Sequence, residues 1–142
     1  ALLIPSSAAY VVAEMVARGV FDMATCQLCV DDAENAIVAK LQKKPDELDQ
    51  TITNWEKLLA DIRLIVVPDP DMASVIATRD KYLGVMRHKA DIPVLAAALK
   101  MDPTPHVILS GNRDHFNDAV ADRCGIKICS CQEFIEFISE AS

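Results

Sequence analysis

Several features common in proteins are missing from this 142-residue chain, and each absence removes a class of function. No apolar run approaches the roughly twenty residues that a membrane-spanning helix needs. The sequence also contains no G-x-S-x-G, P-loop or G-x-G-x-x-G motif, which argues against nucleophilic serine catalysis and against those nucleotide-binding loops. Internal repeats, low-complexity tracts and linkers are missing too. These absences leave a single globular domain outside the membrane.

Positive charge is also in short supply. The chain has 14 Lys and Arg residues against 21 Asp and Glu, a net charge of −7 and a pI near 4.8. This balance argues against non-specific nucleic-acid binding through a broad basic face. It does not exclude a nuclease, because a site built from carboxylates is negative until a divalent metal binds. A local basic group could contact phosphates or form a solvated face: Arg79, Lys81, Arg87, His88, Lys89 and Arg113.

The five cysteines bear on compartment and on metal binding. An odd number of cysteines and no signal peptide predict a cytoplasmic location. Cys26 and Cys29 have C-x-x-C spacing, which suggests zinc. That spacing falls across a strand-to-helix junction, however, and no second C-x-x-C pair exists. We therefore expect structural thiols rather than zinc ligands.

Hydrophobic periodicity predicts one α/β domain, because a chain of this length with 51% hydrophobic residues can bury a sizeable core. Ser6 or Ser7 can cap a first helix that stops at Gly19. Asp71 ends a proline-rich turn and can cap another helix. Further helices are expected over 30–41, 48–60 and 94–99, and strands over 21–26, 62–67 and 106–109.

The stretch 91–116 carries the strongest functional signal. Asp91 is a good N-cap residue, and Pro93 fits the first turn of the Ala-rich helix that follows. The apolar run 106–109 is typical of a strand buried on both faces, as in parallel sheets. The polar residues 110–114 come directly after it, where open α/β sheets place their ligand sites. The alternative is that Asp91 is a plain N-cap and that Asn112 and Asp114 only form a turn.

This stretch strongly resembles the PIN-domain family. Its members carry a D-x-x-x-L-A-A-A-L helix, a hydrophobic strand and a T/S-G-D/N-x-x-x-F loop, which Asp91, 95–99, 107–109, 110–112 and Phe116 match. Residues 125–134 are similar to the family's last strand and closing helix start. In that segment Ser130 and Glu133 form an S-x-x-E capping box. The last helix would dock through an apolar face: Phe134, Ile135, Phe137 and Ile138.

Two further segments resemble the family near the start of the chain. Residues 2–9, with the helix that follows, are similar to the stretch after the family's first strand, which itself ends in a metal-binding Asp-Thr/Ser-Asn motif. The chain has no such Asp and begins without Met, so we expect a fragment or processed chain; aligning 5–7 with the motif would place Pro at the Asp position. Residues 26–37 are similar to the S-P-x-L-L-x-E motif, with Asp32 at the Glu position. Asp31 or Glu34 is the alternative equivalent, and all three could form a solvated helix face.

The resemblance implies a three-layer α/β/α sandwich with a mostly parallel central sheet, formed as a single domain by residues 1–142. It implies a metal-dependent endoribonuclease like the VapC toxins, using Mg²⁺ or Mn²⁺. The implied partners are RNA, an antitoxin protein and a second copy of the chain. The alternative is a catalytically degenerate PIN-like module that binds protein partners.

The resemblance also assigns roles to individual residues. The catalytic carboxylates would be Asp32, Asp91 and Asp114, converging at the carboxyl end of the central strands. Asn112 would join them as a neutral metal ligand. Ser110 would orient the loop and, with Arg113, bind substrate. His115 would contact phosphate, or would be an exposed loop imidazole. The site lacks the first-strand Asp, and Asn112 is neutral where an Asp would carry a negative charge. We therefore expect it to bind metal weakly.

Overall fold

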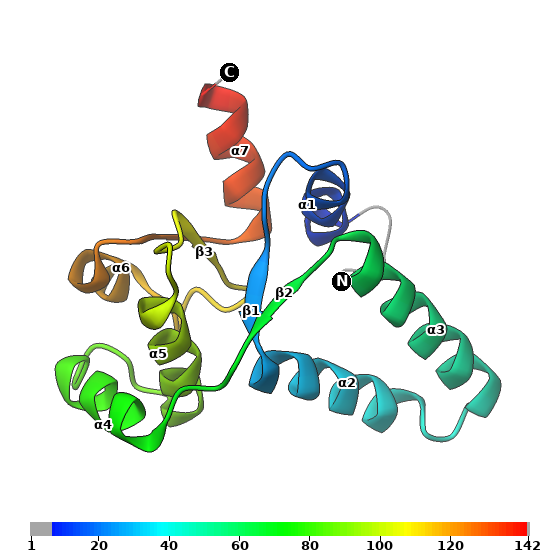
Figure 1. Cartoon of the computed structure of the whole chain (residues 1–142), viewed down its shortest axis with the longest axis horizontal. Helices are drawn as coiled ribbons and strands as arrows, with labels where there is room; N and C mark the ends of the chain where they lie inside the picture. The colour runs from blue at the N-terminus through cyan, green and yellow to red at the C-terminus, as the bar shows by residue number, and fades with distance from the viewer. Residues whose placement is uncertain (1–6, 142) are drawn as a thin grey trace. The chain divides into compact units, whose positions relative to one another are not determined.

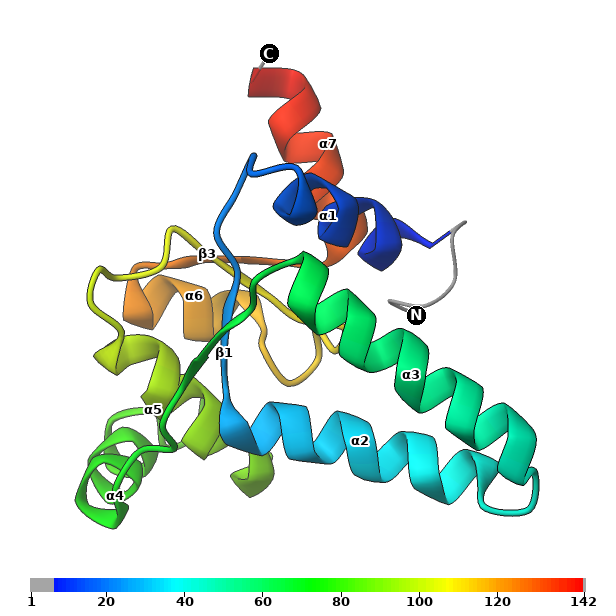
Figure 2. The same cartoon turned by 45° about the vertical axis from the view of Figure 1, so that its right-hand side comes forward.

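The computed structural model describes residues 7–141 of the chain (Figures 1 and 2). The chain divides into two compact units, the first ending at Val67 and the second beginning at Pro68. Seven α-helices and four short strands are found among the described residues, and the strands form two parallel pairs, one in each unit. The prediction of an α/β chain with parallel strands is thus confirmed. Segment 2–6, compared above with the family, lies outside the described residues.

The first unit starts with a capped helix, as its sequence predicts. The Ser7 side chain accepts a hydrogen bond from the backbone N–H of Tyr10 at 3.1 Å, and Gly19 follows the helix with a φ of +80°. A left-handed conformation of this kind favours glycine, which has no Cβ to clash. The elements of this unit are α1 (Ala8–Ala17), β1 (Ala24–Cys26), α2 (Gln27–Leu41), α3 (Pro45–Asp61) and β2 (Ile65–Val67).

Strands β1 and β2 pair in parallel, with Ala24 opposite Ile65, and α2 and α3 form an antiparallel hairpin (Figure 2). Both strands are shorter than the expected 21–26 and 62–67. Residues expected at the start of the second strand have other roles. Ile62 is the C-cap of α3, and Arg63 turns the chain with a φ of +50°. Around Ala13, Val16 and Ile62 the core is completed by Phe21, Met23, Leu58, Leu59 and Leu64.

The second unit alternates helices with its two strands. Its first helix begins at the predicted cap, where Asp71 accepts a hydrogen bond from the Ser74 N–H at 2.8 Å. Asn117 caps a later helix in the same way, with a 3.0 Å bond from Val120 N–H. The elements are α4 (Met72–Lys81), the 3₁₀ turn η1 (Lys89–Asp91), α5 (Ile92–Lys100), β3 (Val107–Leu109), α6 (Asp118–Cys124), β4 (Lys127–Cys129) and α7 (Cys131–Ala141).

Helix α5 forms the centre of this unit. Leu95 is 0% exposed, and the three alanines that follow it are buried, as the Ala-rich sequence predicts. The core around Leu95 combines residues of α5, α6 and β4 with residues of the segments after α4 and β3: Tyr82, Met86, Ile92, Phe116, Val120 and Ile128. The expectation that β3 is buried on both faces is wrong. All three of its residues are only half-buried, and β3 pairs with β4 in a sheet of two strands.

The last helix begins at the predicted capping box. The Ser130 hydroxyl accepts a hydrogen bond from the Glu133 N–H at 3.1 Å, and Glu133 Oε1 accepts one from the Ser130 N–H at 2.9 Å. Phe134 is buried, but Phe137 is 43% exposed and lies below the Lys127 ammonium, 4.7 Å from its ring centre. The prediction that Phe137 docks the helix is therefore wrong. Within residues 7–141 no helix is long and apolar enough to cross a membrane.

Candidate functional site

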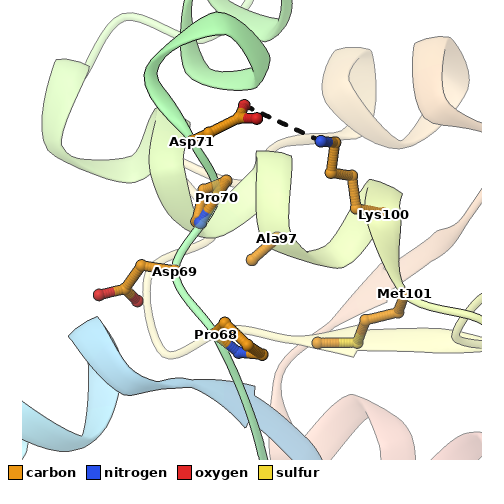
Figure 3. A pocket seen from close by; sticks show the side chains of 7 residues that line it. All are labelled: Pro68, Asp69, Pro70, Asp71, Ala97, Lys100 and Met101. Atoms are coloured by element: carbon orange, nitrogen blue, oxygen red, sulfur yellow. Dashed lines mark ion pairs between the residues drawn. The ribbon is translucent and has the colours of Figure 1, made fainter.

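A cavity of about 350 Å³ opens at the start of the second unit (Figure 3). Its wall combines Pro68, Pro70 and Met101 with an ion pair between Lys100 Nζ and an Asp71 oxygen, 3.9 Å apart. Hydrogen bonds from Ser74, and then the charge of Lys100, hold the pKa of Asp71 below its usual value. The seven lining residues include no thiol, imidazole or hydroxyl group. Groups with more chemical capability lie at the opposite end of α5, a helix of 9 residues and about 13 Å in length.

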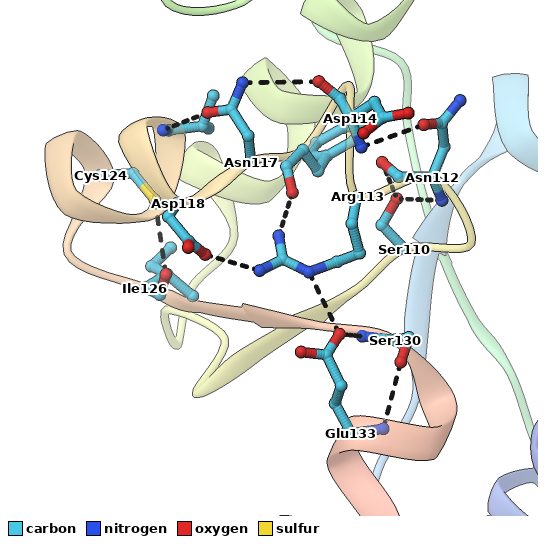
Figure 4. A network of polar contacts seen from close by, with 12 residues as sticks. Ser110, Asn112, Arg113, Asp114, Asn117, Asp118, Cys124, Ile126, Ser130 and Glu133 are labelled. Atoms are coloured by element: carbon cyan, nitrogen blue, oxygen red, sulfur yellow. Dashed lines mark hydrogen bonds and ion pairs between the residues drawn. The ribbon is translucent and has the colours of Figure 1, made fainter.

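The loop after β3 lies at that other end, and polar contacts within it determine its shape (Figure 4). Ser110 Oγ accepts a hydrogen bond from the Asn112 N–H at 3.1 Å and donates one to the Asn112 carbonyl at 3.2 Å. The Asn112 side-chain oxygen accepts bonds from the N–H groups of Asp114 and His115 at 3.2 and 3.4 Å. Ser110 thus orients the loop. The side-chain oxygen of Asn112 is already in use, so its role as a metal ligand stays a prediction.

Asp91 and His115 form the most enclosed polar pair in this region. Asp91 Oδ2 lies 2.7 Å from His115 Nδ1, and the two side chains are 23% and 26% exposed. The His115 ring also stacks on His88, with ring centres 3.4 Å apart and planes 22° apart. The alternative that His115 is an exposed loop imidazole is therefore wrong. Asp91 Oδ2 is buried, and His115 Nδ1 is its close polar neighbour among residues 7–141.

The prediction that the Asp91 side chain caps its helix is also wrong. An N-cap residue has extended backbone and accepts a hydrogen bond from the first turn. Asp91 instead ends the 3₁₀ turn η1 with φ −86° and ψ −15°, and its side chain makes no capping bond. Its carboxylate is thereby directed to His115 rather than to the helix. The Asp91 carboxylate therefore lies beside the loop after β3 and does not help to cap α5.

Arg113, expected to bind substrate, makes three contacts within the protein (Figure 4). Its guanidinium donates to Asp118 at 2.7 Å, to Glu133 at 3.2 Å and to the carbonyl oxygen of Phe116. Asp118 and Glu133 lie at the starts of α6 and α7, and Phe116 lies in the loop that precedes α6. The observed task of Arg113 is therefore to hold this loop against two helices, and its contact with substrate stays a prediction.

We predict that Glu133 makes the protein sensitive to acid. Hydrogen bonds from the Ser130 N–H and hydroxyl, with a smaller effect of Arg113, hold the pKa of Glu133 below its usual value. As the pH falls, the unfolded chain is protonated first, near pH 4.3. The stabilisation is thus complete above that pH and is lost as the pH falls through the lower folded value. Glu133→Gln should flatten the loss of melting temperature between about pH 5 and 3.

Scanning calorimetry across this range checks the Glu133 prediction. Gln132→Ala is the matched control, since Gln132 is a neutral residue of the same helix that bonds Glu136 at 3.2 Å. The control should keep the acid dependence of the parent protein. An unchanged pH profile in Glu133→Gln would show that the capping box and Arg113 do not act through this charge.

Asp32 lies in the first unit, exposed on α2. Its neighbours have contacts of their own: Asp31 accepts a 2.8 Å hydrogen bond from Gln27, and Glu34 accepts one from the Trp55 indole at 3.4 Å. Asp91, Asn112 and Asp114 all lie in the second unit. The predicted convergence of Asp32 with these residues therefore stays a prediction.

The side chains present fit a metal ion only in part. Among the residues described, no group of three His, Cys, Asp or Glu side chains could hold a metal ion. Mg²⁺ often binds through one or two carboxylates, with water and substrate phosphates completing its octahedron. Two carboxylates are available at this loop: that of Asp91, whose side chain is 23% exposed, and that of Asp114, which is exposed.

Sequence reasoning missed that His88 and His115 meet. They are 27 positions apart, outside any helix or strand period, so no sequence pattern could have paired them.

Comparison with known proteins identifies no relative: no family model, curated protein or solved structure matches this chain. Membership of the PIN-domain family therefore stays a prediction that rests on the motifs.

Proposed function

We propose that this chain is a metal-dependent endoribonuclease that hydrolyses RNA phosphodiester bonds at the loop after β3. The observation that carries the proposal is the Asp91 carboxylate, which is 23% exposed, makes no capping bond to α5 and lies 2.7 Å from His115 in the loop after β3. It lies against a loop that also carries Asp114. A bound Mg²⁺ or Mn²⁺ would supply Lewis-acid activation of water and stabilise the leaving oxygen. The PIN-like motifs of the sequence favour this chemistry over other uses of a buried carboxylate.

Each residue of the loop has a task in this proposal. Asp91 provides the main carboxylate, and His115 fixes its orientation through the 2.7 Å contact, as neighbours of metal-binding carboxylates commonly do. Asp114 assists as the second carboxylate. Ser110 and Asn112 keep the loop in shape through their mutual hydrogen bonds. Asp32 and the Asn112 oxygen, which the resemblance adds to the ligands, would strengthen the site.

Substrate phosphates would meet the basic segment that precedes Asp91. Arg87, His88 and Lys89 are all exposed. Arg87 and His88 come immediately before η1, Lys89 is its first residue, and His88 stacks on the loop residue His115. Cationic side chains beside a carboxylate site can hold an anionic strand without a broad basic face. We include in the proposal the other implications of the resemblance: a toxin role with an antitoxin partner, a cytoplasmic location and a three-layer sandwich fold.

Cleavage of single-stranded RNA in different metals tests the proposal. We expect weak cleavage in millimolar Mg²⁺, stronger cleavage in Mn²⁺ and none with chelator. The reason is that few protein carboxylates contribute, and Mn²⁺ binds such sites more tightly than Mg²⁺, which dehydrates reluctantly. Labelled RNA on denaturing gels provides the measurement. Cleavage that persists unchanged in chelator would contradict the metal requirement.

The second candidate function is a non-catalytic module that associates with a second copy of the chain. It is favoured by exposed apolar side chains in α4 and just after it: Met72 is 71% exposed and Ile76 41% in the helix, and Leu83 is 76% exposed beyond its end. Met72 and Ile76 are four residues apart, so they share one helix face. This candidate predicts no cleavage in either metal, together with a concentration-dependent dimer in sedimentation that Ile76→Lys abolishes.

A further inference from the structure

Two thiols meet where β1 passes into α2 in the first unit. Cys26 is the last residue of β1 and the N-cap of α2, and Cys29 lies in the first turn of that helix. Their sulfur atoms are 3.6 Å apart, and both residues are in the thiol form. Cys26 is 2% exposed, whereas Cys29 is partly open to solvent. The pair thus has one enclosed and one accessible sulfur.

The N-cap residue of α2, like those of α3 and α5, makes no side-chain capping bond. Ser7, Asp71 and Asn117 cap α1, α4 and α6 with side-chain oxygens that accept hydrogen bonds from the first turn. Cys26 makes no such bond, although α2 is 15 residues long. A Ser, Asp or Asn at an N-cap is typically worth about 1 kcal/mol over a residue that makes no capping bond. The Cys26 side chain does not cap α2, and its sulfur instead contacts that of Cys29.

The backbone at this junction also allows the sulfurs to bond. Cys26 has extended backbone, with φ −96° and ψ 160°, while Cys29 is helical. Side chains three residues apart lie on the same side of a helix start, about 5–6 Å apart at Cβ. A disulfide needs the Cβ atoms at about 3.8 Å and the sulfurs at about 2.05 Å. Side-chain rotation does not move a Cβ atom, so closing this gap takes a shift of the backbone at Cys26, which lies outside the helical turn.

We propose that Cys26 and Cys29 are a reversible dithiol–disulfide site that exchanges electrons with small-molecule disulfides. The Cys29 thiolate attacks one sulfur of the small disulfide, forming a mixed disulfide and releasing one thiolate, which takes up a proton. The Cys26 thiolate, having lost its proton to solvent, then attacks Cys29 Sγ and releases the second small thiol. Two electrons pass from the protein to the small disulfide, and reducing thiols reverse both steps.

The remaining cysteines provide a comparison within the same chain. Burial raises the pKa of both the Cys129 and the Cys131 thiols, which reduces the reactive thiolate. Cys124 Sγ donates to the Ala121 carbonyl oxygen at 3.6 Å. Among the described cysteines, the pair at the start of α2 has its two sulfur atoms in contact, 3.6 Å apart. A disulfide between Cys26 and Cys29 would constrain the first turn of α2, the helix that carries Asp32.

The test treats the full chain with oxidised glutathione, blocks the remaining thiols with an alkylating agent and measures intact and peptide masses. We expect a loss of two hydrogens, no retained glutathione and a Cys26–Cys29 cross-link. Cys26→Ser should instead retain one glutathione on Cys29, because the thiol that resolves the mixed disulfide is missing. Cys29→Ser should take up little glutathione, because Cys26 is enclosed. The double variant Cys129→Ser/Cys131→Ser should oxidise like the parent protein.

Several results would overturn the proposal. Both thiols of the parent could remain alkylatable after the treatment, or glutathione could remain on Cys29 without a cross-link. A disulfide mapped to Cys129 and Cys131 would also contradict it, as would equal glutathione uptake by Cys26→Ser and Cys29→Ser. Far-UV circular dichroism of each variant checks folding. The parent and the Cys129→Ser/Cys131→Ser variant decide the outcome even if a substitution at the junction prevents folding.

Discussion

Leu95→Ala should lower the free energy of unfolding by about 2–5 kcal/mol. Leu95 is 0% exposed and lies at the centre of the core of the second unit. Removing its side chain deletes buried methyl groups and leaves a cavity that close-packed neighbours can only partly fill. Urea unfolding followed by far-UV circular dichroism measures the change.

Leu83→Ala is the matched control for this substitution. Leu83 is 76% exposed, so the same side chain is removed without forming a cavity. We expect a change within about 0.5 kcal/mol of the parent protein, as for most surface substitutions. Equal losses for Leu83→Ala and Leu95→Ala would contradict the description of α5 as the centre of this core.

Asp91→Ala should reduce Mn²⁺-dependent RNA cleavage on the order of a hundredfold or more. Replacing a residue that merely supports a metal ligand often costs about 10–100-fold, and the loss of a ligand should reach at least the upper end. The folded structure should survive, because the Asp91 side chain makes no capping bond to α5. Initial cleavage rates, with circular dichroism as a check of folding, measure the effect.

Two further variants separate charge from position. Asp91→Asn keeps the shape of the side chain but removes its charge, and it should lose nearly as much activity as Asp91→Ala. Asp118→Asn removes an acidic group that is 90% exposed and pairs with Arg113; it should retain most of the activity. Activity that survives Asp91→Ala would refute the assignment of this carboxylate.

Local interactions account for the features that the sequence predicted correctly. The caps at Ser7 and Asp71 and the capping box of Ser130 with Glu133 each join residues three positions apart. Such contacts depend on few dihedral angles, so the order of residue types is enough to predict them. The parallel strand pairs and the buried alanines of α5 likewise follow from apolar runs and their spacing.

The features that the sequence did not predict depend on distant residues. Asp is a residue type that is common at N-caps, but the 3₁₀ turn before α5 gives Asp91 a helical backbone and directs its carboxylate to His115. The run 106–109 has the composition of a fully buried strand, but burial depends on which elements cover each face. The stacking of His88 on His115 joins two loops, and only the packing of the second unit brings them together.

Calorimetric titration of Mn²⁺ tests the central claim most directly, because it measures metal binding at Asp91 without depending on RNA or turnover. We predict one saturable binding site in the parent protein, lost or greatly weakened in Asp91→Ala and retained in Asp118→Ala. Equal Mn²⁺ binding by the parent and Asp91→Ala would contradict the assignment of Asp91 as the carboxylate that holds the metal.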